Sequence, residues 1–404
     1  MFDDKLLIAR EQRAYLIGKM SQNFDTVTVK ANVPGWEKNI PLAKLVTKHF
    51  ARIVRKIGVS ALKEHYSLDG LTVFGKVNNG LEFKEFAVAT EEVHPLGRLV
   101  DIDVILKGEK QSLSRGNLRK CFLCDNPAFV CGKNKTHTVG ELLNHFNDTA
   151  YKYFHNLITK TVKESMTKEL NIENKFGLVT PTSNGSHKDM SYSTMVDAIN
   201  VISERLADAF FVGLNADKCE NFAKKLIPIG LDCEKRMLEV TNGANAYKGF
   251  IFAGGLLLAS SGFALSNALS FSQVYDVCAS VYNDFPMPKD TFGFESYQKG
   301  FGGIRKEAKT GFLTVKKAQT LINKKAPWQV LTFILSQIDD SVLLKRTKTI
   351  EKYDYFKNLI VNANNENRKA VTEECVKNNV SIGGSADILI CAYLMNKLKQ
   401  NFIF

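Results

Sequence analysis

The alternation of apolar and polar residues in the first 105 positions predicts a small domain that mixes helices with strands. Apolar residues recur at helical spacing over 3–20 and again over 41–57. Residues 24–33 alternate instead, as in a half-buried strand that ends at Pro34-Gly35. Two further strands are predicted over 71–78 and 84–90, and another around Asp101. This order of elements is typical of an α+β fold.

From residue 141 onward the pattern is helical almost throughout. A long helix is predicted over 141–170, followed by helices over 191–211, 217–226, 233–241, 249–264, 270–283, 315–322, 327–340, 351–364, 366–378 and 384–400. No Pro- or Ser-rich linker separates the mixed helix-and-strand pattern from the helical pattern. The domain boundary near residue 150 is therefore expected inside a continuous helix. We therefore predict an α+β domain over residues 1–148 and an all-α domain over 149–404.

The composition is typical of a globular protein and indicates which kinds of partner it attracts. A chain of 404 residues with 45% hydrophobic and 24% charged residues fits a globular protein of two or three domains. Its formal net charge of +12 attracts polyanions, which include nucleic acid, phosphorylated small molecules and acidic proteins. The charged N-terminal residues do not resemble a signal peptide. Eight cysteines are too few for a disulfide scaffold and are expected to be reduced, in the cytoplasm.

One apolar stretch, Gly249 to Leu265, approaches the length of a membrane span. It is slightly short, contains three glycines and has two serines at its middle. A close-packed buried helix is therefore the expected structure, and we expect no membrane partner.

Two carboxylates converge on the strand expected around residue 101. Asp101 and Asp103 are two positions apart, so both side chains point to the same side of a strand. Such a pair suits divalent metal ions that carry a phosphate chain, and Mg²⁺ is the ion expected. Arg98 would bind the leaving pyrophosphate, and Arg115 adds positive charge nearby. The alternative is an exposed edge strand with two solvated carboxylates.

A cysteine-rich segment follows the aspartates. Cys121, Cys124, Cys131 and His137 are separated by two, six and five residues, and their side chains are ligand types that suit tetrahedral zinc. The spacing matches no common zinc motif tightly. The alternative is a set of reduced structural cysteines in a compact turn.

Glycine-rich turns that lead into helices recur in the second half. Turns of this kind expose backbone N–H groups that hold phosphate, and several together with cations and carboxylates would form a polyphosphate site. Taken alone, the turn at Gly185 is an ordinary helix cap with an incidental histidine. The candidate residues at or near these turns are His187, Asp189, Glu234, Lys248, Arg305, Glu307, Gly383, Gly384 and Asp387.

The first half carries motifs that are specific in combination. These are Arg10-Glu11-x-Arg13, Asn32-Val-Pro-Gly35, Glu92, His94-Pro-Leu-Gly-Arg98, Asp101-Ile-Asp103, Ser114-Arg115, the Cys121–His137 segment with Thr138, and Glu141-Leu142. Over residues 5–146 they resemble the holo-acyl-carrier-protein synthases of citrate lyase, the phosphoribosyl-dephospho-CoA transferases.

That resemblance implies a nucleotidyltransferase-like fold with Asp101 and Asp103 as its acidic pair. It also implies that a serine of the citrate lyase acyl carrier protein (the γ subunit) attacks the α-phosphate of triphosphoribosyl-dephospho-CoA and releases pyrophosphate. A third carboxylate is usual in such sites, and Glu92 is the candidate.

Residues 150–398 resemble the triphosphoribosyl-dephospho-CoA synthases. The resemblance implies an all-α fold that condenses ATP with 3′-dephospho-CoA, the CoA ribose 2′-hydroxyl displacing adenine. The cationic transition state calls for carboxylates, with Asp189, Glu234, Glu307 and Asp387 as candidates, while Lys248 and Arg305 are candidates for the triphosphate. Which carboxylate acts as acid and which as base stays open.

The chain departs from the synthase pattern at a few positions. Tyr247 stands where the family has His, Phe176 and Ile382 where it has Pro, and Thr347 where it has Gly. The favoured interpretation is a bifunctional enzyme, and one alternative is an active transferase with an inactive synthase half. A basic nucleic-acid-binding protein with a cysteine-rich knuckle is another alternative. It would need exposed aromatics among its basic residues, whereas the aromatics here fall mostly at apolar helical positions.

Overall fold

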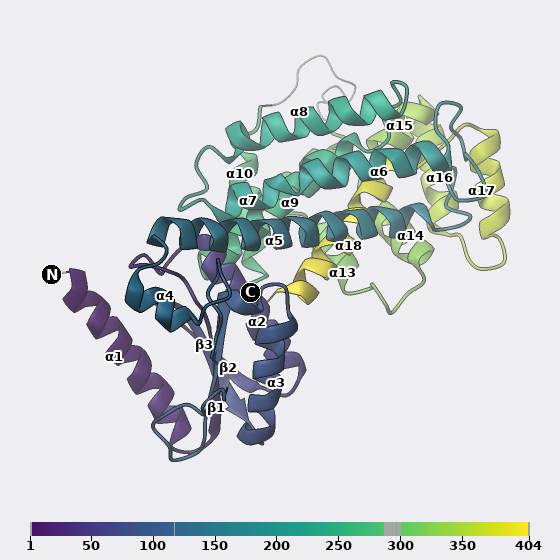
Figure 1. Cartoon of the computed structure of the whole chain (residues 1–404). Coiled ribbons are helices and arrows are strands. Elements are labelled where there is room, and N and C mark those ends of the chain that lie inside the picture. The colour runs from purple at the N-terminus through teal and green to yellow at the C-terminus, as the bar shows by residue number, and fades with distance from the viewer. Residues whose placement is uncertain (1, 117, 287–295, 297–299, 403–404) are drawn as a thin grey trace. The chain divides into compact units, whose positions relative to one another are not determined.

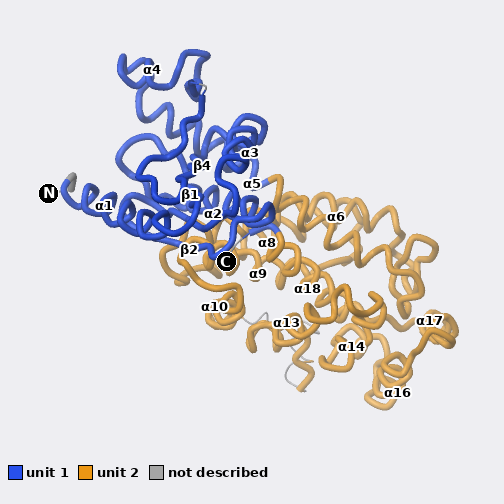
Figure 2. The backbone as a smooth tube through the Cα atoms, turned by 90° about the horizontal axis from the view of Figure 1, so that it is seen from below, with its two compact units in different colours: residues 1–155, 401–404 blue, residues 156–400 orange. Residues whose placement is uncertain are grey.

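The chain forms two compact units in a computed structural model that describes residues 2–116, 118–286, 296 and 300–402 (Figure 1). One unit comprises residues 1–155 with 401–404, and the other comprises residues 156–400 (Figure 2). Helix α5 (Val139–Leu170) passes from one unit into the other without a break.

The first unit is built on an antiparallel four-stranded sheet with the strand order β2-β3-β1-β4. Its elements are α1 (Phe2–Ser21), β1 (Asp25–Ala31), α2 (Pro41–Lys56), β2 (Ser60–Ser67), β3 (Gly70–Val77), α3 (Gly80–Val93), a 3₁₀ turn (Gly97–Leu99), β4 (Val100–Ile105), α4 (Ala128–Asn134) and the first half of α5. The α+β class predicted for this part of the chain is confirmed.

The two faces of this sheet have different roles. On one face, Val27 and Val29 of β1 and Ile102 and Val104 of β4 are buried beneath α2 and α3. Helix α1 lies across from them, on the other side of the strands (Figure 1). The second face therefore carries the polar residues of β1 and β4, and it is free to line a site.

Two sequence predictions in this unit are wrong. Residues 84–90 are not a strand but the middle of α3, where the Asn79 side chain caps the helix by accepting a hydrogen bond from the Glu82 backbone N–H at 3.3 Å. Buried Phe83 and Ala87 lie four residues apart, which is the helical period. Strand β2 was missed because it is an edge strand with no clear apolar alternation, and its side chains are mostly exposed.

The second unit is entirely helical over its described residues. Its helices are the second half of α5, α6 (Tyr192–Leu206), α7 (Asp208–Leu214), α8 (Phe222–Val240), α9 (Lys248–Ser266), α10 (Gln273–Tyr282), α12 (Gly303–Lys309), α13 (Leu313–Gln319), α14 (Pro327–Gln337), α15 (Ser341–Thr347), α16 (Ile350–Val361), α17 (Arg368–Lys377) and α18 (Gly383–Asn401). The helix predicted over 191–211 is divided into α6 and α7. The two predicted over 217–226 and 233–241 are one helix, which continues through Pro228.

Helix α9 is the core of this unit. Among the described residues it is the one helix long and apolar enough to cross a membrane, and 89% of its apolar window is buried inside the protein. A Cβ on Gly262 would lie 2.1 Å from the Phe210 carbonyl oxygen, and one on Gly213 would lie 1.7 Å from that of Ala259. The glycines therefore let α7 and α9 pack backbone against backbone, as the prediction of a close-packed buried helix requires.

Candidate active sites

A cavity of 1190 Å³ lies against the polar face of the sheet in the first unit. It is lined by residues of α1, β1 and β4 and by the connections around them. The charged residues in its wall are Arg10, Arg13, Lys19, Lys30, Lys38, Asp69, Asp101, Asp103, Glu109 and Lys110. The structure thus places the two predicted aspartates together in a largely cationic pocket.

The sheet register aligns the aspartates with two residues of β1. Lys30 is the cross-strand partner of Asp101, and Thr28 is the partner of Asp103. Burial, and next the charge of Asp101, raise the pKa of Asp103. A divalent cation bound between two carboxylates on one face of a strand would stabilise them in the charged form.

A third carboxylate, Asp69, was not found from the sequence. It lies in the turn between β2 and β3, its side chain is 1% exposed, and it pairs with Arg10, Arg13 and Lys30. Although burial works to raise it, the pKa of Asp69 is lowered, first by the hydrogen bond from Lys30 and then by the nearby positive charges. Asp69 therefore fixes the cations of α1 and β1 around the cavity.

Lys30 has an unusual environment for an ammonium group. Burial lowers its pKa to about 8, against the opposing effect of the hydrogen bond to Asp69. The sequence signal for Lys30 was its place on the polar side of the alternating strand, opposite the valines.

Arg98, Arg115 and Glu92 do not line this cavity. They line a neighbouring one of 680 Å³, together with the loop that carries Cys121. The expectation that Arg98 stands beside the aspartate pair therefore needs correction. The physical reason is that Arg98 lies in the 3₁₀ turn that precedes β4, so it does not share the strand alternation that aligns Asp101 and Asp103.

Arg119 lines the 680 Å³ cavity and contacts Asp101 in the wall of the larger one. Its guanidinium pairs with both Asp101 and the buried carboxylate of Glu91. Glu91 also accepts a hydrogen bond from the Ile102 backbone N–H at 2.6 Å and pairs with Arg115 at 2.6 Å. The segment that carries both arginines is thus held against the start of β4.

A second cavity, of 160 Å³, lies inside the helical unit. Segments far apart in the sequence meet there: the end of α5, the turn before α6, the start of α9 and the start of α18. Its polar lining includes Glu169, Lys175, His187, Asn245, Tyr247, Lys248, Ser381 and Asp387, and Gly249 and Gly383 complete it at two helix starts.

Asp387 and Glu169 are the two carboxylates in the lining of this cavity. Asp387 is partly buried near the start of α18, and a Cβ on Gly249 would stand 2.2 Å from its Oδ2 atom. Glycine at position 249 therefore lets the start of α9 approach the carboxyl. Burial, together with the charges of Asp340 and Glu169, raises the pKa of Asp387 well above its ordinary value. These surroundings favour the protonated form of the carboxyl.

His187 is held neutral and in one orientation. Burial, and then the charge of Arg346, lower its pKa to about 4. The Arg346 guanidinium lies 3.0 Å from His187 Nδ1 and donates to the backbone carbonyl of Ser186 at 2.9 Å. A guanidinium only donates, so Nδ1 accepts and the imidazole proton is on Nε2. His187 is thus a hydrogen-bond donor at the cavity.

Three further buried groups line the cavity, and of these Lys175 and Glu169 were not found from the sequence. Lys175 and Glu169 form an ion pair at 2.8 Å with side chains 1% and 3% exposed. The hydroxyl of Tyr247, a residue 2% exposed, has no hydrogen-bond partner among the described residues. An unpaired buried hydroxyl costs free energy, which suggests that it is retained for a ligand.

Asp340 organises the two helix starts beside the cavity. One oxygen accepts from the backbone N–H groups of Val342 and Leu343 at 2.9 and 3.0 Å, which caps α15. The other accepts from the backbone N–H and the hydroxyl of Ser385, both at 2.8 Å, in the first turn of α18. Nothing in the local sequence indicated this second role, because Ser385 lies 45 positions away.

Replacing Asp340 by Ala should lower the free energy of unfolding by about 2–4 kcal/mol, since two helix starts lose their cap. Asp339→Ala is the matched control. Asp339 pairs with a mostly exposed Lys306, and such pairs contribute less than about 1 kcal/mol. Urea unfolding followed by circular dichroism measures both, and equal losses would contradict the role given to Asp340.

The remaining predicted residues lie at the rim or outside the cavity. Glu234 pairs with Lys248 at 2.8 Å, and that lysine is 58% exposed. Asp189 is not in the lining but acts on His187 and Arg346 through its charge.

Arg305 and Glu307 also lie outside the lining of the cavity that contains His187 and Lys248. Arg305 stacks over the Phe252 ring at 4.9 Å. Glu307 accepts hydrogen bonds from the backbone N–H and the hydroxyl of Thr314, at 3.0 and 2.8 Å, in α13. The physical reason is that Glu307 stabilises a helix start rather than facing the cavity.

Two family models match the chain in succession. The family described as apo-citrate lyase phosphoribosyl-dephospho-CoA transferase matches residues 3–153, and the family described as ATP:dephospho-CoA triphosphoribosyl transferase matches residues 155–403. The first match covers the sheet, and the second covers the helical unit.

Two relatives match the chain along nearly its whole length, and a third matches part of it. "Protein CitXG" of Leuconostoc mesenteroides subsp. cremoris and "Protein CitXG" of Haemophilus influenzae are each 27% identical to the chain, over 98% of it and 96% of the relative. The "2-(5''-triphosphoribosyl)-3'-dephosphocoenzyme-A synthase" of Haemophilus ducreyi is 26% identical, over 66% of the chain and 96% of its own length.

Proposed function

The chain belongs to the ATP:dephospho-CoA triphosphoribosyl transferase family and carries an apo-citrate lyase phosphoribosyl-dephospho-CoA transferase domain before it. We propose that the 1190 Å³ cavity of the first unit and the 160 Å³ cavity of the helical unit are the active sites of these two activities. The protein is a bifunctional transferase. The helical unit makes triphosphoribosyl-dephospho-CoA from ATP and 3′-dephospho-CoA with release of adenine. The α+β unit transfers the phosphoribosyl-dephospho-CoA group to the acyl carrier protein of citrate lyase with release of pyrophosphate.

In the transferase site, Asp101 and Asp103 would hold Mg²⁺, and the acceptor would be a serine of the γ subunit. The surroundings of Asp103 support the assignment, because burial and next the charge of Asp101 raise its pKa, and a bound cation would favour the charged form. Mg²⁺ would neutralise charge on the attacked phosphate. Arg10, Arg13 and Lys30 line the same cavity and would bind the triphosphate. Asp69, already paired with all three, positions them.

In the synthase site, the protonated carboxyl of Asp387 would give its proton to the departing adenine. The raised pKa of Asp387 suits it to this step. His187 would donate its Nε2 proton in a hydrogen bond to phosphate, and Lys248 at the rim would add positive charge. Of the four carboxylates proposed from the sequence for this reaction, Asp387 is thus the one assigned to proton transfer.

The single observation that carries the proposal is that each family match contains its own cavity with its own carboxylates. A two-stage assay tests it. The protein is first mixed with ATP and 3′-dephospho-CoA, and free adenine is measured by chromatography. Apo acyl carrier protein is then added, and its mass gain and the released pyrophosphate are measured. We expect both stages to proceed. Carrier modification only when the triphosphoribosyl intermediate is supplied would instead indicate an inactive helical unit.

Tyr247→Phe separates stability from function in the synthase site. Removing a buried hydroxyl that lacks a partner should raise the free energy of unfolding by about 1 kcal/mol. If that hydroxyl binds substrate, the same change should slow adenine release about tenfold. Unfolding and steady-state kinetics measure the two effects. Unchanged kinetics in the more stable variant would show that the hydroxyl has no part in the reaction.

A further inference from the structure

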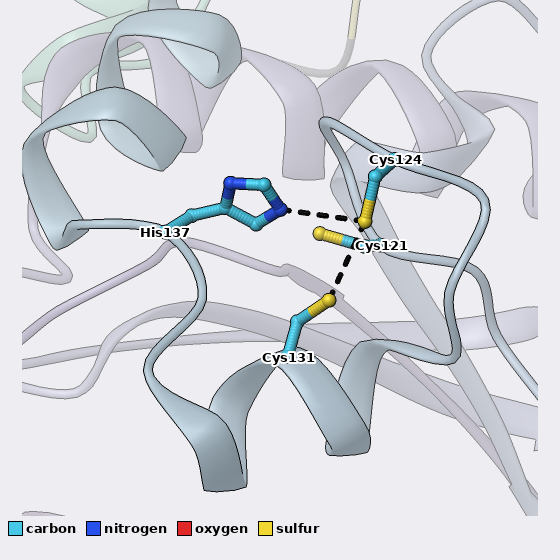
Figure 3. A group of neighbouring side chains, drawn as sticks. All are labelled: Cys121, Cys124, Cys131 and His137. Carbon is cyan, nitrogen blue, oxygen red and sulfur yellow. Dashed lines mark hydrogen bonds between the residues drawn. The ribbon is translucent and has the colours of Figure 1, made fainter.

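Four side chains with metal-binding atoms converge beside the transferase site. Cys121 and Cys124 lie in the loop after Arg119, Cys131 lies on α4, and His137 lies between α4 and α5 (Figure 3). Their sulfur and nitrogen atoms are all within 4.8 Å of one another. Figure 3 shows the three sulfur atoms and the imidazole directed toward a common centre.

The separations agree with the edges of a zinc tetrahedron. Zn–S bonds of about 2.3 Å and Zn–N bonds of about 2.0–2.1 Å place two sulfurs about 3.8 Å apart, and a sulfur and a nitrogen about 3.6 Å apart. Here Cys124 Sγ lies 3.4 Å from Cys131 Sγ and 3.3 Å from His137 Nε2. A disulfide would need about 2.05 Å, and all eight cysteines are free thiols.

The backbone around Cys121 forms a compact, hydrogen-bonded turn. The N–H groups of Leu123 and Cys124 donate hydrogen bonds to the Cys121 sulfur. The loop closes through hydrogen bonds from the Cys121 N–H to the Asn126 carbonyl at 2.8 Å and from the Ala128 N–H to the Arg119 carbonyl at 2.7 Å. This turn of two cysteines is thus preformed for a metal rather than shaped by apolar packing.

The segment between β4 and α5 also needs a stabilising element. Among its described residues, regular structure is limited to the short helix α4 and an isolated bridge between Lys120 and Pro127. Of its apolar side chains, Leu118 is 69% exposed and Phe129 is 61% exposed. Segments with so little core are commonly held by a structural metal.

We propose that Cys121, Cys124, Cys131 and His137 bind a structural Zn²⁺ ion. Four protein ligands close the coordination shell, which distinguishes this site from a catalytic zinc with an open position. The zinc clip, defined as these four residues and their ion, lies two residues from Arg119. It therefore holds in place the arginine that pairs with Asp101 and Glu91.

Metal analysis of the full chain tests the binding. Protein purified under reducing conditions with zinc supplied should contain one equivalent of tightly held Zn²⁺. Protein loaded with Co²⁺ should show the thiolate-to-cobalt absorption of a tetrahedral sulfur-rich site. Cys124→Ser should lose both signals, whereas the control Cys219→Ser, which changes a half-buried thiol in the helical unit, should keep them.

Other outcomes would overturn the proposal. Wild-type protein that holds no zinc after supplementation and dialysis would do so, as would a Cys124–Cys131 disulfide found by mass spectrometry in protein kept reduced. Equal zinc in wild type and Cys124→Ser would show adventitious binding elsewhere. Because the wild-type metal content and cobalt spectrum need no variant, misfolding of Cys124→Ser would not prevent the test.

The positioning role of the clip rests on the proposed function and has its own readout. Zinc is removed from wild-type protein with a chelator under reducing conditions, the chelator is removed, and both reactions are assayed with Mg²⁺ in excess. Carrier modification should fall at least about tenfold, and adenine release should be unchanged. Adding Zn²⁺ back should restore carrier modification. A zinc-binding protein whose carrier modification survives metal removal would keep the metal site but overturn its role in placing Arg119.

Discussion

Asp103→Asn will lower carrier modification at least about 100-fold and leave adenine release at the wild-type rate. The amide cannot supply the negative charge that holds the metal, and metal stabilisation of a transferring phosphate contributes several kcal/mol. Burial and Asp101 already favour the neutral form of Asp103, so a neutral side chain of the same shape will not unfold the sheet. The mass of the carrier protein and the adenine released measure the two activities in one sample.

Supplying the triphosphoribosyl intermediate should not rescue this variant, since its defect lies in the second reaction. Glu85→Gln is the matched control, because Glu85 is an exposed residue on α3 in the same unit. Loss of both activities in a folded Asp103→Asn protein would mean that the two reactions share one site. If the variant kept both activities, the carboxylate pair would not bind the metal.

In the transferase site, contacts between residues close together in the sequence could be predicted, whereas contacts between distant residues could not. Asp101 and Asp103 share a strand, so their spacing alone placed them on one side. Asp69 reaches Arg10 and Lys30 only because β2, β3 and β1 pair, and that pairing connects residues 39 and 59 positions apart. An edge strand as polar as β2 offers no alternation from which to infer such contacts.

The synthase site shows the same limit in a helical unit. The family assignment and both activities predicted from the motifs are confirmed. Each glycine-rich turn was visible in the sequence, but their local patterns are alike and do not show which of them meet. Packing around α9 brings Gly249 and Asp387 together, whereas Glu307 stabilises α13. Only the long-range contacts in the structure show which glycine-rich turns line the cavity and which one does not.

Asp387→Asn should slow adenine release by about 10²–10⁴-fold, the usual contribution of a positioned general acid. Burial and the neighbouring carboxylates keep Asp387 protonated, so the neutral amide should preserve the fold. Carrier modification should return to the wild-type rate when the triphosphoribosyl intermediate is supplied. Asp197→Asn is the control, because Asp197 is exposed on α6.

The pH profile distinguishes proton transfer from simple binding at Asp387. The acid form is the active one, so wild-type adenine release should fall as pH rises through the raised pKa of Asp387. The residual activity of Asp387→Asn should lack that decline. Gly249→Ala is a second test of Asp387, because the new Cβ would stand 2.2 Å from Asp387 Oδ2 and displace the carboxyl. A variant that lost activity but kept the wild-type alkaline decline would assign the proton to another residue.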